Sequence, residues 1–187
     1  MEIQFARVGS RRYSVIVHRA GQPSLEMNPA PGYHDLMPHD LLHFVVERSL
    51  RLRRGIFGQL AAGGTAGTFH LRPVASSTRE QSRRARTLSR RGAKLARDGR
   101  GDCEVSERAA QVCHAVWAAR ARAGAPPRGS SGSNPLPPQL GANVGNGVVV
   151  TPERLNRICT ELDDLSAAWI QLDIGQCLTL VWPDSQA

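Results

Sequence analysis

Two histidines and an acid occupy positions that a helix would bring together. His39, His43 and Glu47 are four residues apart, and this spacing places their side chains in one row on the same face of an α-helix. Two neutral imidazoles one turn apart can bind the same zinc ion. Glu47 is one candidate for a third ligand, but eight residues span about 12 Å along a helix axis, so we also consider His34 and His70. The sequence thus offers a candidate metal site at His39 and His43.

The spacing is similar to that of the His-Glu-x-x-His helix of zinc peptidases, in which the carboxylate between the histidines acts as general base. Asp40 stands at that place here. Its side chain is one methylene shorter than glutamate, which would draw the base back from a metal-bound water. A metal-dependent hydrolase that uses zinc as cofactor and Asp40 as catalytic group is therefore one alternative function.

The same residues also have an ordinary structural interpretation. His39 can be solvated at the start of a helix, His43 can be hydrogen-bonded at the edge of a groove, and Glu47 can pair with Arg51 one turn later. No other part of the sequence completes a catalytic set. The leading hypothesis is therefore a non-enzymatic interaction module that needs no cofactor.

Positive charge is concentrated in one stretch. The 187 residues include 24 Lys and Arg against 16 Asp and Glu, a net charge of +8, and residues 79–100 contain nine basic residues against two acids. A helix with this charge attracts phosphate through counterion release, without reading a base sequence. The alternative is a solvated face, because the stretch has no aromatic side chains on which bases could stack. The residues that we single out for contact with nucleic acid or another polyanion are Arg83, Arg84, Arg90, Arg91 and Lys94.

The ends of the chain carry strand patterns and the middle carries helical ones. Residues 2–8 and 12–19 alternate around the turn signal Gly9-Ser10 and predict a β-hairpin. Residues 176–182 are apolar on both faces, so we expect a strand in the middle of the same sheet. Apolar residues at spacings of three and four predict the helices, which we expect over residues 38–54, 78–98, 105–122 and 152–169.

These elements predict an α+β fold, in which a small antiparallel sheet of the N-terminal hairpin and the C-terminal strand packs against helices. We place the core in residues 1–75 and 148–183. Residues 76–123 would form an inserted, arginine-rich antiparallel helical hairpin. Residues 124–147, rich in Gly, Pro and Ser, have too few apolar side chains to offset the entropy of ordering and predict a flexible linker.

Three motifs stand out at the two ends of the chain: Pro38-His39-Asp40-Leu41-x-His43-Phe44-Val45-Val46-Glu47, Gly55-x-Phe57-Gly58-x-Leu60-Ala61-Ala62-Gly63 and Leu178-x-Leu180-x-Trp182-Pro183. In these motifs the chain resembles small uncharacterised bacterial proteins. The resemblance covers the first helix, the glycine-rich run after it and the last strand, and it leaves out the arginine-rich middle and the linker. It implies the boundaries of the two ends and no activity.

Other features of the sequence bear on the compartment. No apolar run reaches the roughly 20 residues that a membrane span requires, and residues 1–5 lack the basic start and apolar centre of a secretion signal. The four cysteines form no Cys-x-x-Cys pair, which argues against a zinc ribbon and a disulfide framework. We therefore expect a cytoplasmic protein without membrane contact, and the sequence does not identify its protein partner.

Overall fold

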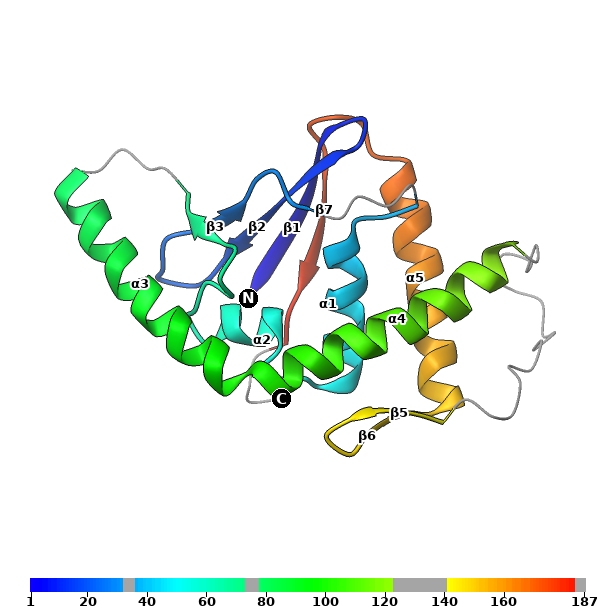
Figure 1. Ribbon diagram of the computed structural model, residues 1–187. Coiled ribbons are helices and arrows are strands. Elements are labelled where there is room, and N and C mark those ends of the chain that lie inside the picture. The colour runs from blue at the N-terminus through cyan, green and yellow to red at the C-terminus, as the bar shows by residue number, and fades with distance from the viewer. Residues whose placement is uncertain (32–35, 73–77, 123–140, 184–187) are drawn as a thin grey trace.

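The computed structural model describes residues 1–31, 36–72, 78–122 and 141–183, and it shows an α+β fold (Figure 1). The chain opens with the expected hairpin of β1 (Glu2–Gly9) and β2 (Arg12–His18). Alternation along β1 buries Ile3 and Phe5 on one face, because successive side chains of a strand point to opposite sides. The short strands β3 (Leu25–Met27) and β4 (His70–Leu71) extend the sheet beyond β2.

The last strand, β7 (Cys177–Val181), pairs with β1 and confirms that the two ends of the chain meet in one antiparallel sheet. The strand order is β4-β3-β2-β1-β7, which makes β7 an edge strand. Our expectation that it lies in the middle of the sheet was wrong. Only one face of β7 is covered, since Leu178 and Leu180 pack against the core while Cys177, Thr179 and Val181 are exposed.

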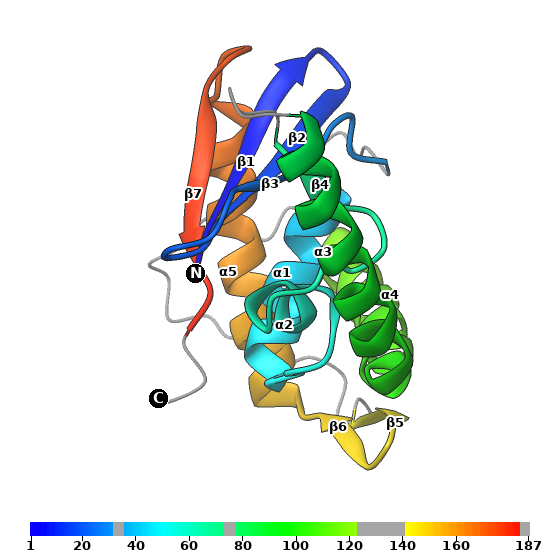
Figure 2. The ribbon, with the colours of Figure 1, turned by 90° about the vertical axis from the view of Figure 1, so that its left-hand side faces the viewer.

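Three helices cover one face of this sheet: α1 (His39–Leu50), α2 (Ile56–Ala61) and α5 (Pro152–Ile170) (Figure 2). Edge-on aromatic contacts tie them to the strands. The ring of Phe5 lies 6.1 Å from that of Phe44 in α1, and the ring of Tyr13 lies 6.3 Å from that of Trp169 in α5. At the start of α5 the hydroxyl of Thr151 accepts a hydrogen bond from the backbone N–H of Arg154, as expected of an N-cap residue.

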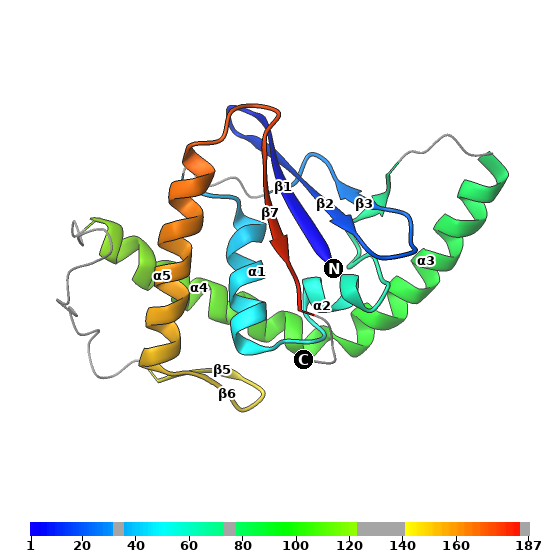
Figure 3. The ribbon, with the colours of Figure 1, turned by 180° about the vertical axis from the view of Figure 1, so that it is seen from behind.

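The arginine-rich middle forms two long helices, α3 (Thr78–Asp98) and α4 (Arg100–Arg122), joined at Gly99. We expected an antiparallel hairpin, but the helices run away from each other on either side of this glycine (Figures 1 and 3). A side chain at Gly99 would approach the carbonyl oxygen of Arg54 to 2.2 Å, so glycine lets the junction rest against the loop after α1. The joined helices therefore follow the body of the protein instead of packing on each other.

Helix α4 belongs to the core. It packs against α1 and α5 and buries Val105, Ala109, Cys113 and Trp117. The indole N–H of Trp117 also donates to Asp163 of α5 at 2.7 Å. The apolar face that we assigned to a helical hairpin is thus used for packing on the first and last helices.

A second, two-stranded sheet consists of β5 (Ala142–Gly145) and β6 (Val148–Val150). The guanidinium of Arg108 in α4 donates to the carbonyl oxygen of Val144 at 2.7 Å and holds this hairpin against the helix. Strand β5 falls inside the range that we predicted as a linker, and residues 123–140 of that range lie outside the described residues.

Within the described residues, no helix is both long and apolar enough to cross a lipid bilayer. All four cysteines carry free thiols, with Cys113 and Cys159 buried in the core.

Candidate metal centre

Helix α1 places the two histidines as their spacing predicts. Pro38 precedes the helix with extended backbone, so that His39 becomes its first residue and His43 follows one turn later. The two rings meet edge to face, with centroids 4.6 Å apart. Their Nε2 atoms are 3.0 Å apart, at hydrogen-bond distance, so one ring donates to the other and both nitrogens lie at one place.

The third group of the cluster is Glu107, from α4. Its Oε2 lies 3.8 Å from Nε2 of His43, and one ligand atom from each of the three residues lies within 4.8 Å of the other two. Helix α4 crosses α1 in both views of Figures 1 and 3, and the two helices are in contact. Among the residues that the structure describes, this is the one group of three potential metal ligands, and our sequence analysis did not include Glu107.

The distances suit a tetrahedral ion. Metal–ligand bonds of 2.0–2.1 Å imply ligand atoms about 3.3 Å apart at tetrahedral angles. The separations of 3.0 Å and 3.8 Å lie on either side of that value. The side chain of His43 is 2% exposed and fixed by packing, whereas that of Glu107 is 57% exposed and can move the small distance that remains. Three ligands fill three of four positions, and the exposure of His39 and Glu107 leaves the fourth open to solvent.

A second row of residues orients His43. Its Nδ1 lies 2.9 Å from the hydroxyl of Ser106, and this hydroxyl donates to Oε1 of Glu47 at 3.0 Å. When Glu47 is ionised, the single hydroxyl proton of Ser106 goes to its carboxylate, so Nδ1 of His43 carries the donor proton and Nε2 keeps its lone pair. Such carboxylate-linked hydrogen bonds fix the tautomer of metal-binding histidines.

The electrostatics favour the same neutral state. Burial of the ring lowers the pKa of His43 to about 4, with a smaller electrostatic contribution from the nearby His39. A neutral imidazole is the form that binds a metal.

Glu47 has a different place from the one we expected. It is fully buried and accepts hydrogen bonds of 2.9 Å from the backbone N–H groups of Ile56 and Phe57, at the start of α2. A side chain on Gly55 would lie 2.5 Å from the carboxyl carbon of Glu47, so glycine makes room for this contact. Burial raises the pKa of Glu47 to about 7, against the opposing effect of its hydrogen bonds. Glu47 is therefore neither a surface acid nor a member of the ligand cluster, because its oxygens accept hydrogen bonds from the start of α2 and from Ser106.

Asp40 also makes its contacts outside the ligand cluster. The hydroxyl of Tyr13 in β2 lies 2.5 Å from Oδ2 of Asp40 and 2.5 Å from the carbonyl oxygen of Pro31. Burial raises the pKa of Asp40 and also that of Tyr13. This carboxyl therefore joins α1 to the sheet, and the structure does not place it in the ligand cluster.

The two other candidate ligands do not join the cluster. His34 lies outside the described residues. His70 is exposed in β4, opposite Glu26 of β3 in the sheet register.

The five candidate polyanion-binding residues separate into two groups. Arg84 forms an ion pair of 2.5 Å with Glu80, and the guanidinium of Arg91 lies over the backbone of Gly63. All five side chains are exposed, and the second group consists of Arg83, Arg90 and Lys94.

Comparison with known proteins adds nothing to these observations, because no family model, curated protein or solved structure matches the chain.

Proposed function

We propose that this protein binds one divalent transition-metal ion, for which Zn²⁺ fits best, through His39, His43 and Glu107. The observation that carries the proposal is the convergence of two imidazole Nε2 atoms, 3.0 Å apart, beside a carboxylate oxygen from another helix. Two imidazoles and a carboxylate are an established donor set for zinc. With Glu107 as a third ligand we now prefer a metal-binding function. The hypothesis of a non-enzymatic interaction module was based on the absence of a complete set of functional residues in the sequence.

The role that we assign to the ion is to fasten α4 to α1. His39 and His43 belong to the first helix after the hairpin, and Glu107 comes from a helix far along the chain. A bound ion would therefore add a link between two segments that already contact through side-chain packing and through the hydrogen bonds of Ser106 with His43 and Glu47. Its free energy of binding would add to that of folding, because the three ligands do not converge in the unfolded chain.

Removal of a single exposed ligand tests the proposal with little risk to folding. We expect the chelator-stripped protein to take up one equivalent of zinc and to compete with a chromophoric chelator. The variants His39→Gln and Glu107→Gln should weaken zinc binding by more than about 100-fold. A loss of about 100-fold is the upper end of what is expected when only a hydrogen-bond partner of a metal ligand is removed.

Two variants serve as matched controls. His70→Gln removes an exposed histidine outside the cluster, and Glu104→Gln removes an acid that faces Arg100 one turn before Glu107. Both should keep the affinity of the unmodified protein. Equal zinc affinity in the Glu107→Gln variant and in the unmodified protein would refute the site.

A further inference from the structure

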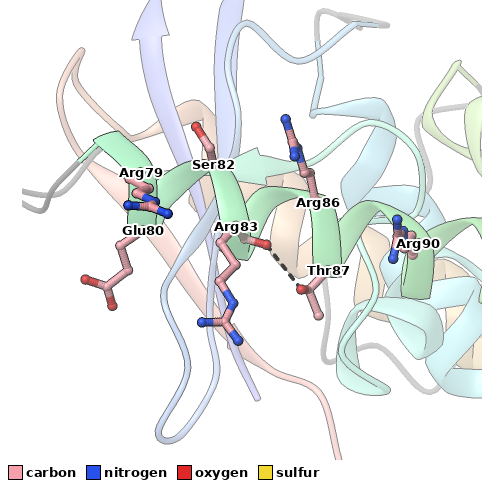
Figure 4. A pocket seen from close by; sticks show the side chains of 7 residues that line it. All are labelled: Arg79, Glu80, Ser82, Arg83, Arg86, Thr87 and Arg90. Carbon is pink, nitrogen blue, oxygen red and sulfur yellow. Dashed lines mark hydrogen bonds between the residues drawn. The ribbon is translucent and has the colours of Figure 1, made fainter.

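One face of α3 carries a row of six cations that recur every three or four residues. At 100° per residue they fall within about 80° of the circumference of the helix. All six side chains are exposed. Figure 4 shows the first four of them on α3, beside Glu80, Ser82 and Thr87. We call this row the arginine stripe, and its members are Arg79, Arg83, Arg86, Arg90, Lys94 and Arg97.

The opposite side of α3 holds the helix to the protein. Leu88 packs against the core, and a side chain on Gly64 would meet Leu95 at 2.9 Å. Gly92 lies so close to Thr65 that a side chain there would approach the threonine hydroxyl to 2.7 Å. Leu88, Gly92 and Leu95 lie about half a turn of the helix away from the stripe. The stripe therefore faces away from the body of the protein.

The charge of the stripe is not balanced by its surroundings. In the described part of the chain, no carboxylate oxygen lies within 4.0 Å of a stripe cation, and the neighbouring Glu80 is paired with Arg84. Like charges one turn apart, such as Arg79 and Arg83, oppose helix formation. An anionic partner would remove this repulsion, so binding would stabilise the helix that presents the charges.

We propose that the arginine stripe binds the sugar-phosphate backbone of duplex nucleic acid without reading its sequence. From Arg79 to Arg97 the stripe is about 27 Å long, which equals the axial length of about eight base pairs at 3.4 Å each. The planar guanidinium group forms paired hydrogen bonds with phosphate oxygens. The partner is thus a long, regular array of phosphates.

The rest of α3 distinguishes this partner from two others. The helix contains no aromatic residue, and single-stranded nucleic acid is bound chiefly by stacking of bases on aromatic rings. The leucines of α3 lie on the side that faces the protein, so no large apolar side chain is free to enter a lipid surface. Both features favour contact with a phosphate backbone alone.

The salt dependence of binding to a mixed-sequence DNA duplex tests this inference. Six phosphate contacts predict a slope of about −5 in a plot of the logarithm of the binding constant against that of salt concentration, or about a 1000-fold loss between 50 and 200 mM salt. Fluorescence anisotropy with the full chain measures both quantities. A second duplex of scrambled sequence should bind equally well.

A charge-matched pair of variants separates the stripe from overall charge. The double variant Arg83→Gln, Arg86→Gln should reduce the slope by about 2, one unit for each phosphate contact. The double variant Arg12→Gln, Arg157→Gln removes the same charge at exposed positions of β2 and α5 and should leave the slope unchanged. Circular dichroism confirms that both variants are folded.

Several outcomes would overturn the inference: no binding at low salt, equal effects of the two double variants, or tighter binding to single-stranded DNA than to the duplex. Equal binding to phosphatidylserine vesicles or to polyglutamate would also overturn it, because the partner would then be any anionic surface. The inference is independent of the metal centre, since the stripe and the metal ligands share no residue. Addition of a chelator should not change the binding to DNA.

Discussion

Two buried ionisable residues of α1, His43 and Glu47, should affect stability in opposite directions as the pH changes. The pKa of Glu47 is raised from 4.5 to about 7, so the folded protein holds a proton that the unfolded chain releases between these values. Its contribution to stability is fully present below pH 4.5 and is lost as the pH rises to 7. The loss is about 3 kcal/mol, at 1.36 kcal/mol per pKa unit.

His43 has the opposite effect. Its pKa is lowered from 6.5 to about 4, so the unfolded chain binds a proton that the folded protein excludes. Stability therefore rises as the pH increases from 4 to 6.5, also by about 3 kcal/mol. Over the shared interval the two effects nearly cancel, and single substitutions should reveal each of them.

Urea unfolding of the metal-free protein between pH 4 and 7 measures both effects. The difference in unfolding free energy between the unmodified protein and His43→Gln should grow by about 3 kcal/mol from pH 4 to 6.5, and the difference from Glu47→Gln should shrink by about 3 kcal/mol from pH 4.5 to 7. All other titrating groups are common to the three proteins and cancel in these differences. Two differences that stay constant with pH would show that the reasoning from burial is wrong.

Two further predictions concern the residues around Glu47. Ser106→Ala removes the hydroxyl that orients His43 and should weaken zinc binding by about 10- to 100-fold, as a chelator competition measures; unchanged affinity would show that the hydroxyl does not position the ring. Gly55→Ala should destabilise the protein by about 1–3 kcal/mol in urea unfolding, because the added methyl group displaces a carboxylate held by three hydrogen bonds. Gly141→Ala, where a side chain has room, is its control, and equal stability of the two variants would contradict the packing described here.

The sheet and the principal helices were readable from the sequence because their signals are local. Alternation in residues 2–8 and 12–19 and the cap at Thr151 each depend on neighbouring residues alone. The position of α4 was not readable. The spacing of Val105, Ala109 and Cys113 shows that a helix face is apolar, but not which element covers it. The prediction that β7 lies in the middle of the sheet was wrong for the same reason, since apolar residues on both faces of a strand do not require that both faces be covered.

The candidate site was predictable only where its residues share a helix. The four-residue spacing of His39 and His43 brings the rings together within α1, whereas Glu107 joins them only because α4 crosses that helix. No local pattern marks Glu107 as a ligand. The role of Glu47 did have a signal, since an acid directly after the apolar run Phe44-Val45-Val46, followed by Gly55 and a short second helix, is suited to a buried hydrogen-bonding role.

The metal position itself tests the central claim most directly. Anomalous diffraction at the zinc absorption edge, from crystals grown with zinc, should show one peak about 2.0–2.1 Å from Nε2 of both His39 and His43 and about 2.0–2.2 Å from a carboxylate oxygen of Glu107. Well-ordered side chains at these three residues without an anomalous peak between them, or a peak only at another residue such as His70, would contradict the account.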